Sequence, residues 1–344
     1  MRTMNRREFG LMTAMSLLVT LPLGNLAAAQ EATPTNPAAS ASPAAETGLQ
    51  NTTLRQDWQT TGNPAQAIFA GGSVSVAPDG NIWVFDGGGG VFQIFSPDGK
   101  YLESWDGSGD GVEGFKFSHD DQSYEGDVAF GADGTIATLE RGARRVRIYN
   151  ADRTLRQEWG GFGPQDGHFV DATGLALDGD GNVYVSDEGR GDVQAFTPDG
   201  TFLRSIGGAG SGDGQLENVK YLTVSPDGNV LAMDRGAGEV KEYTSDGKFV
   251  RQIGGESGLQ RPEDVAVDAA GNIYVADTNS GRIVVFDPEG NELVAWETGK
   301  TMSGGLNLPY AVAVDGAGAV YVSGVGMSHD DESNLQKFTI EPAS

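Results

Sequence analysis

The amino-acid sequence predicts an all-β protein, a six-bladed β-propeller whose blades are four-stranded antiparallel sheets. A phrase of one apolar strand, a glycine turn and a second apolar strand occurs six times, with its turn glycine at Gly80, Gly134, Gly181, Gly228, Gly271 and Gly318. Successive glycines lie 43 to 54 residues apart, a period typical of propeller blades. A sheet this small cannot bury both faces alone, so we expect the blades to close into a ring.

The fifth copy shows the four strands of one blade in order. An inner strand over 265–268 is followed by a turn at 270–272 and a second strand over 273–277. A third strand over 283–286 and an outer strand over 292–296 complete the unit. Glycine beside Asn or Asp supplies the positive φ that a two-residue hairpin needs. Each copy is therefore expected to form one antiparallel blade.

The fifth copy also carries a family resemblance. Its residues 265–290, VAVDAAGNIYVADTNSGRIVVFDPEG, resemble the NHL repeat. The resemblance extends from Asn51 to about Pro342, and five copies match closely. It implies a six-bladed ring whose relatives include the amidating-lyase propeller and, more distantly, gluconolactonase-like and streptogramin-lyase-like rings. The resemblance implies that such enzymes hold an axial metal with histidines or carboxylates from several blades, a pattern that this chain does not match residue by residue.

The last blade needs a strand from elsewhere in the chain. The sixth copy stops at 338–340, with too few residues left for an outer strand, while residues 53–58 are similar to the outer strand at 154–159. An unpaired edge strand is prone to pair with other chains. We therefore expect the N-terminal strand to complete the last blade and close the ring.

Three segments are predicted along the chain. Residues 1–29 carry Arg6-Arg7, an apolar stretch and a small-residue cleavage pattern, and resemble a twin-arginine signal peptide. Residues 30–50 are predicted to be a disordered linker rich in Ala, Pro, Ser and Thr, and residues 51–342 the propeller. We expect an exported bacterial protein, secreted, periplasmic or attached to the cell wall, without an integral membrane segment after cleavage. A retained anchor helix is the alternative.

Composition limits the kinds of partner. The formal net charge is −25, and the 23 Lys and Arg residues are scattered. A phosphate backbone would be repelled, so we expect no nucleic-acid binding. The chain has no cysteine, which excludes a disulfide, a thiolate site and a lipid-anchored cysteine. We expect a monomer.

The repeat places acids at one end of the ring. Loops between second and third strands share this end with the crossings from blade to blade, and we call it the upper face. In five copies the second strand ends here in an acid, at Asp86, Glu140, Asp187, Asp234 and Asp277. We expect these acids to accept backbone N–H groups of the following loop.

Two insertions interrupt the repeat on the upper face. Both contain the tetrapeptide Ser-His-Asp-Asp, so the candidate metal ligands are His119, Asp120, Asp121, His329, Asp330 and Asp331. Imidazole with carboxylates suits a transition metal, whereas carboxylates alone suit calcium. One hypothesis is that the two loops, in neighbouring blades, share one divalent cation. The other is that both are solvated loop tips.

The entrances of the inner strands form a second constellation, at the channel mouth. Alignment of the copies puts Asp127, Tyr221 and Asp264 at one level and Lys220, Glu263 and Tyr310 one residue earlier. The second and fifth blades lie opposite each other in a ring of six, so the two aspartates are expected to face across the axis. They either hold a cation or a basic ligand, or they accept hydrogen bonds from neighbouring strand ends.

Two functions from different classes follow. The first is a non-enzymatic binding or scaffold protein that holds a protein, peptide or glycan ligand at its upper face and channel. The second is a metal-dependent lyase or lactonase-like hydrolase with calcium or a transition metal near the channel mouth. The sequence displays no phosphate loop, nucleophile elbow or Cys-His pair, and we favour the first.

Overall fold

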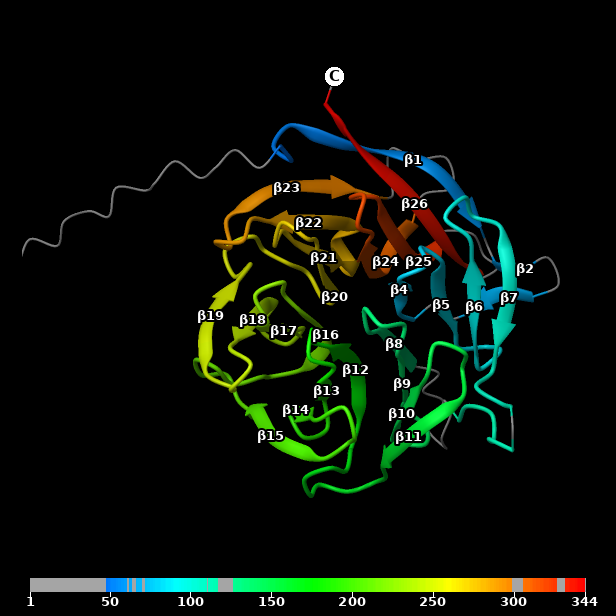
Figure 1. Cartoon of the computed structure of the whole chain (residues 1–344). Coiled ribbons are helices and arrows are strands. Elements are labelled where there is room, and N and C mark those ends of the chain that lie inside the picture. Colours follow the sequence, from blue (N-terminus) through cyan, green and yellow to red (C-terminus); the bar gives the residue numbers. More distant parts are fainter. Residues whose placement is uncertain are drawn as a thin grey trace, which may run out of the picture. The chain divides into compact units, whose positions relative to one another are not determined.

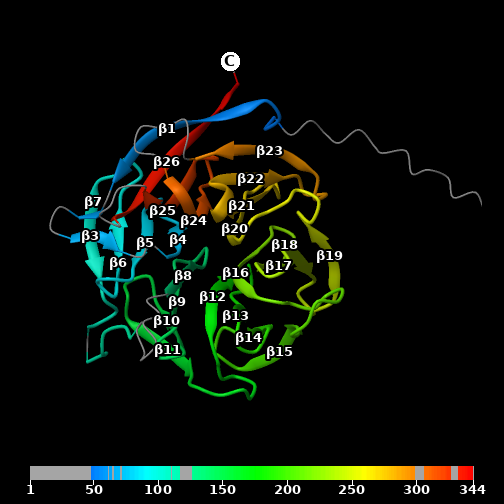
Figure 2. The same ribbon diagram turned by 180° about the vertical axis from the view of Figure 1, so that it is seen from behind.

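The computed structural model describes residues 48–60, 62–63, 66–69, 72–109, 111–116, 126–298, 306–326 and 332–343. These residues form six antiparallel sheets arranged around a central axis (Figures 1 and 2). The predicted six-bladed propeller is confirmed. The only helical segment in the described part of the chain is the 3-10 turn η1 (Thr278–Ser280). No helix there is long and apolar enough to cross a membrane.

Five blades are built from four consecutive strands each. The first contains β4 (Val74–Val76), β5 (Ile82–Asp86), β6 (Val91–Phe95) and β7 (Tyr101–Trp105). The second contains β8 (Gly126–Phe130), β9 (Ile136–Glu140), β10 (Arg145–Tyr149) and β11 (Leu155–Gly160). The third contains β12 (Ala172–Leu177), β13 (Val183–Asp187), β14 (Asp192–Phe196) and β15 (Phe202–Gly207). The fourth contains β16 (Val219–Val224), β17 (Val230–Asp234), β18 (Glu239–Tyr243) and β19 (Phe249–Ile253), and the fifth β20 (Pro262–Val267), β21 (Ile273–Asp277), β22 (Arg282–Phe286) and β23 (Glu292–Glu297).

The sixth blade joins both ends of the propeller. Its strands β24 (Leu306–Val314), β25 (Val320–Gly326) and β26 (Glu332–Pro342) are followed in space by β1 (Thr52–Thr60). Strand β1 runs antiparallel to β26, with Thr52 opposite Pro342 and Thr60 opposite Leu335. The beginning of β26 pairs instead with β3 (Gln66–Phe69), which also pairs with β2 (Gly62–Asn63). The predicted closure of the ring by the N-terminal strand is confirmed.

The core lies between neighbouring blades. Trp83, Phe92 and Trp105 of the first blade pack with Ile136 and Tyr149 of the second in one buried cluster. The indole of Trp105 meets the Tyr149 ring edge to face, with centroids 4.8 Å apart, an arrangement that aromatic pairs favour. Each sheet therefore buries its faces only because the next blade covers them.

The inner hairpin turns lie at the end of the ring opposite the upper face, which we call the lower face. In the third blade, Asp178 Oδ1 accepts the N–H groups of Asp180 and Asn182, at 2.9 and 2.8 Å. The Tyr184 hydroxyl donates to Asp178 Oδ2 at 3.1 Å, and Tyr274 contacts Asp268 in the same way in the fifth blade. These turn acids hold the local hairpin, as Asx turns do.

A substitution in the closing strand β1 tests this architecture. Leu54 on β1 is 7% exposed and packs in the cluster that joins the fifth and sixth blades. We expect Leu54→Ala to lower the free energy of unfolding by about 2–5 kcal/mol, because it leaves a cavity in a core. Thr53→Ala, at an exposed neighbouring position, should change it by less than about 0.5 kcal/mol. Urea unfolding followed by tryptophan fluorescence measures both, and equal effects would contradict ring closure through β1.

Candidate functional site

The acids at the ends of the second strands hold the upper face together. Asp187 accepts the N–H groups of Val170 and Asp171 from the preceding crossing, at 2.7 and 2.8 Å, and that of Arg190 from the following loop, at 3.1 Å. In the fourth blade, Asp234 likewise accepts N–H groups from the crossing at 3.0 and 2.9 Å. The sequence predicted the following loop alone. The crossing contributes more because it passes over the strand end before the inner strand begins.

In the second, third and fourth blades, the residue after the second-strand acid forms an ion pair with the next blade. Arg141 forms a two-pronged ion pair with Asp171, at 2.6 and 2.7 Å. Lys220 Nζ lies 2.6 Å from Glu188 Oε2, and Arg235 Nη1 lies 3.1 Å from Glu263 Oε1. We call these three pairs the upper-face clasps: Arg141–Asp171, Lys220–Glu188 and Arg235–Glu263. Bidentate and buried pairs of this kind fix side-chain geometry, so the clasps lock blades two to five to one another.

In the Lys220–Glu188 clasp, burial and the charge of the partner shift each pKa in opposite directions. Burial lowers the pKa of Lys220, and the Glu188 carboxylate opposes this effect. For Glu188, burial alone would raise the pKa, but the Lys220 ammonium group lowers it below the ordinary value. Both groups are therefore expected to be ionised at neutral pH and to compensate each other.

Irregular pairing separates two sets of side chains at the channel mouth. The register between inner and second strands shifts between Val219 and Leu222 and between Pro262 and Asp264. A bulge of this kind re-aims the side chains of the extra residues. Lys220 and Glu263 consequently join the upper-face clasps, whereas Tyr221 and Asp264 line the axis. Tyr310, at the corresponding shift between Pro309 and Ala311, is half-buried and does not line the axis.

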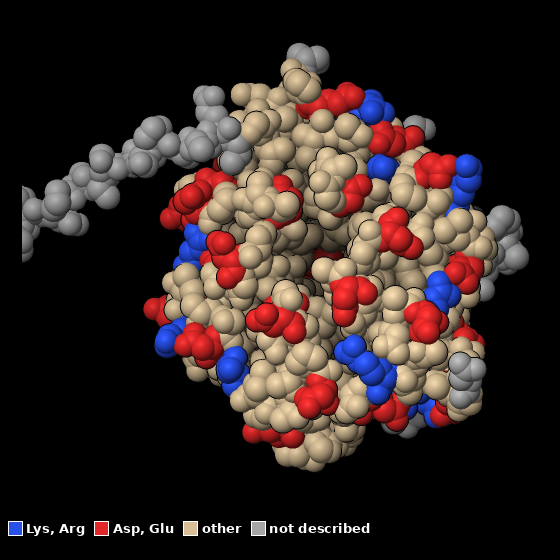
Figure 3. Space-filling model, in the orientation of Figure 1, with Lys and Arg blue, Asp and Glu red and all other residues tan. Residues whose placement is uncertain are grey.

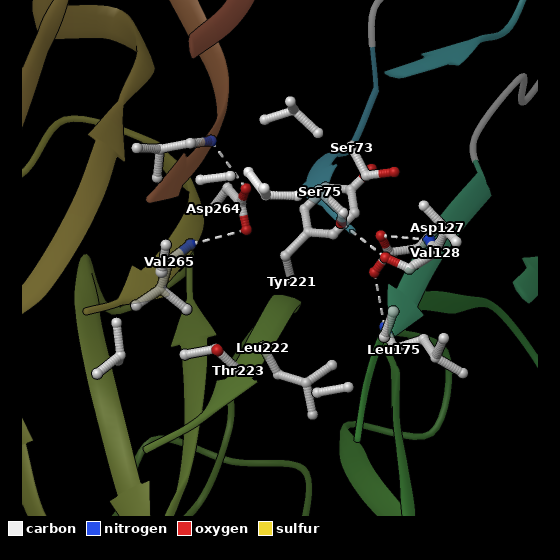
Figure 4. Close-up of a pocket in the computed structure, with 18 of the residues that line it drawn as sticks. Ser73, Ser75, Asp127, Val128, Leu175, Tyr221, Leu222, Thr223, Asp264 and Val265 are labelled. Carbon is white, nitrogen blue, oxygen red and sulfur yellow. Dashed lines mark hydrogen bonds between the residues drawn. The ribbon is translucent and has the colours of Figure 1, made fainter. Parts of the chain in front are cut away.

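Asp127 and Asp264 each bridge two blades through the backbone. Asp127 accepts the N–H of Val128 on its own strand and that of Leu175 on the next blade, both at 2.8 Å. Asp264 accepts the N–H groups of Val265 and Val312 in the same way, at 2.8 and 3.0 Å. Figure 4 shows these contacts on the two sides of the channel. The carboxylates thus satisfy strand ends, one of the two roles that the sequence left open.

Tyr221 crosses the axis between these two carboxyl groups (Figure 4). Tyr221 belongs to the fourth blade, but its hydroxyl oxygen reaches the entrance of the first blade. A Cβ atom added at Gly72 there would lie 3.6 Å from this oxygen. Burial raises the pKa of this phenol well above its usual value, and the Asp127 and Asp264 carboxylates act in the same direction. Tyr221 therefore stays protonated and presents a hydroxyl group at the axis.

A cavity of about 230 Å³ lies below Tyr221. The inner strands of all six blades form its walls. These walls extend from the level of Asp127, Tyr221 and Asp264 toward the ends of the strands at the inner hairpins. Among the described residues, none from the upper-face loops lines the cavity, and its walls run toward the hairpin ends at the lower face. In the space-filling view along the axis, the ring is hollowed at its centre, and acidic groups surround the opening (Figure 3).

Comparison with known proteins agrees with the fold. Residues 259–286 match the model of the NHL repeat. The matched residues cover three of the four strands of the fifth blade, β20, β21 and β22. The resemblance inferred from the sequence is thereby confirmed, and the propeller that carries it has the six blades expected. No curated protein matches the chain.

Solved structures resemble this propeller at low identity. A streptogramin B lyase has a TM-score of 0.57 and 12% identity, covering 83% of this chain and 98% of the lyase. A virginiamycin B lyase from Staphylococcus aureus has a TM-score of 0.58 and 12% identity, covering 84% and 99%. A protein of unknown function from Bacteroides thetaiotaomicron has a TM-score of 0.60 and 15% identity, covering 85% and 76%. These likenesses show a shared fold.

The predicted metal ligands fall in segments that the structure does not describe. His119, Asp120 and Asp121 precede the described stretch that begins at 126, and His329, Asp330 and Asp331 precede the one that begins at 332. Their metal site stays a prediction. Within the described ranges of the chain, no group of three or more His, Cys, Asp or Glu residues is placed to hold a metal ion.

Some functional residues were missed from the sequence. Lys220 and Glu263 were named from the sequence as channel-mouth residues, but the upper-face clasps that they form were missed. The clasps had a signal, because Arg141, Glu188 and Arg235 each follow a second-strand acid directly. Ser73 had one too, because it occupies the same position of the repeat as Asp127 and Asp264, whereas Ser75 had none. Ser73 Oγ donates to the Gly126 carbonyl at 3.0 Å and Ser75 Oγ to the Val128 carbonyl at 2.6 Å, so both join the first blade to the second.

The buried carboxyl group of Asp127 predicts a pH dependence of stability. Burial raises its pKa to about 7, whereas an unfolded Asp titrates at about 3.9. Between these values the folded state binds more protons than the unfolded state. The stabilisation that Asp127 contributes is therefore present at low pH and lost as the pH rises from about 4 to about 7.

We expect the Asp127→Asn variant to lack this contribution. The free energy of unfolding of the wild type relative to the variant should fall between about pH 4 and about pH 7, by at most about 1.4 kcal/mol per pH unit. Asp264, Tyr221 and Glu263 face the same site and remain in both proteins. Ser75→Ala removes a neighbouring hydrogen bond without a titrating group and should shift the curve equally at every pH. Parallel curves for wild type and Asp127→Asn would contradict the assignment.

Proposed function

We propose that this chain is an exported, non-enzymatic binding or scaffold protein that holds a protein, peptide or glycan partner at its upper face and central channel. The observation that carries the proposal is the clasped upper face. Its charged side chains are paired across blade boundaries, as Arg141 is with Asp171 and Arg235 with Glu263. A surface whose side chains are held in advance loses little conformational entropy when a partner binds.

The same pairing argues against hydrolytic or lyase chemistry in the described site. A general base must be within reach of substrate and a metal needs several free ligands. Here Asp127 and Asp264 accept backbone N–H groups with both oxygens, and Lys220 is held by Glu188. The described part of the chain thus supports recognition better than catalysis. The resemblance to streptogramin B lyase is one of fold.

Export is part of the proposal and rests on the sequence. Residues 1–29 have the order of charged, apolar and small residues that export signals share. The net charge of −25 favours basic partners over acidic ones. A partner outside the cell membrane with a basic or neutral surface fits both features.

An array of peptides and glycans, followed by calorimetry of the bound class, tests the proposal. We expect Arg235→Gln to weaken binding of that class at least about tenfold, because it opens a clasp on the upper face. Arg156→Gln changes an exposed arginine beside the turns of the lower face and should leave the affinity unchanged. Equal losses in both variants, or turnover of an ester, lactone or streptogramin B in the presence of Ca²⁺ or Zn²⁺, would contradict a non-enzymatic upper-face function.

A further inference from the structure

We propose that the inner end of the axial cavity is a binding site for an aliphatic primary ammonium group, which enters from the lower face. Three oxygen-bearing side chains meet there, Asp127, Tyr221 and Asp264. The proposal rests on the binding function proposed above and gives the channel its ligand class. It reverses the expected direction of access, which was from the upper face.

An unused hydroxyl group points to a ligand. Tyr221 is 8% exposed, and its ring lies between the two carboxyl groups (Figure 4). Among the described residues its hydroxyl oxygen has no hydrogen-bond partner. Buried polar groups in proteins are nearly always paired. A hydroxyl held at the end of a cavity and left without a partner is therefore expected to bind a ligand or an ordered water.

The number of free acceptors matches one ammonium group. An ionised carboxylate has about four acceptor positions, and Asp127 and Asp264 each use two for the backbone. Each carboxylate and the Tyr221 oxygen therefore retain acceptor capacity toward the axis. A primary ammonium group carries three N–H donors and no acceptor. Such a group can donate to those oxygens of this set that it reaches from the cavity.

The walls select a slim aliphatic tail. Next below the carboxyl groups, every blade contributes a small side chain to the cavity, namely Ser75, Ala129, Ala176, Thr223, Ala266 and Ala313. Below these, the lining is apolar at Val76, Phe130, Leu177, Val224, Val267 and Val314. A volume of about 230 Å³ admits a chain of several methylene groups, whose burial favours binding by about 0.8 kcal/mol each in general.

Charge favours a cation over an anion or a neutral ligand. No Lys or Arg lines the cavity, and every inner hairpin turn at the lower face carries an acid, at Asp79, Asp133, Asp178, Asp180, Asp227, Asp268 and Asp315. Acidic groups surround the opening in Figure 3. A cleft lined by one sign of charge concentrates ligands of the opposite sign.

A metal ion fits less well than an ammonium group. Calcium takes six to eight oxygen ligands, while half of the carboxylate positions here already accept backbone N–H groups. The described residues offer no group of three His, Cys, Asp or Glu side chains to a metal. An ammonium group needs only the three acceptors present.

Binding should release protons. Burial raises the pKa of Asp127 to about 7 and that of Asp264 well above its usual value. An ammonium group beside these carboxyls stabilises their ionised forms. Binding of the ammonium group at pH 6.5 is therefore expected to release a fraction of a proton per molecule from the Asp127 and Asp264 carboxyl groups.

Isothermal titration of the purified protein with hexylammonium tests the site, in two buffers of different ionisation enthalpy. We expect saturable binding with proton release, and binding of 1-hexanol at least about tenfold weaker. Tyr221→Phe should weaken hexylammonium binding at least about tenfold. The matched control is Tyr243→Phe, which removes a hydroxyl of the same blade that donates to the Gly214 carbonyl at 3.3 Å and does not line the cavity; its affinity should stay within twofold.

The result that overturns the proposal is absence of hexylammonium binding, equal loss in both tyrosine variants, or binding of Ca²⁺ that hexylammonium does not displace. Titration with N-acetyl-lysine amide distinguishes the two sources of the ligand: binding as tight as that of hexylammonium supports a lysine side chain of a partner, and weaker binding supports a free amine. If hexylammonium fails while the partner class of the array still binds and depends on Arg235, only the ammonium site is wrong and the proposed function stands.

Discussion

The structure depends on one constraint: the inner strands of six sheets converge on one axis, and their buried polar groups must find partners in the next blade. Hydrogen bonds from side chains of one blade to the backbone of the next provide these partners. Asp127 accepts the N–H of Leu175, and Asp264 that of Val312. Ser73 donates to the Gly126 carbonyl and Ser323 to that of Gly72. Unpaired groups of this kind would cost about 1–3 kcal/mol each, so these side chains are as necessary to the ring as its apolar core.

The same constraint explains where binding is possible. Side chains used at the junctions keep only part of their hydrogen-bonding capacity for a ligand, and the upper-face clasps use further charges in the same way. Tyr221 is different, because it points across the axis instead of to a neighbouring strand (Figure 4). It separates the clasped upper mouth from the cavity that faces the lower face. The two ends of one channel thus acquire different surfaces, one of paired charges and one of small and apolar side chains with acids around the opening.

Much of the fold was predictable because it repeats. The period of the turn glycines predicted six blades, and the missing outer strand after 338–340 predicted the pairing of residues 53–58 with the last blade. The same register placed Asp127 and Asp264 at one level. Side-chain direction at the mouth was not predictable, because it depends on register shifts such as that between Pro262 and Asp264. The crossing of Tyr221 depends on the width of the closed ring, which no local pattern encodes, and the histidine loops remain a prediction outside the described residues.

Amide hydrogen exchange at Leu175 and Val312 tests this account most directly, since these two N–H groups join separate blades through Asp127 and Asp264. If the junctions hold the ring together, both amides exchange only when the whole propeller unfolds, with the free energy of global unfolding. Exchange through a local opening, at rates near those of exposed loop amides, would show that the carboxylates are free for other roles and would contradict the account.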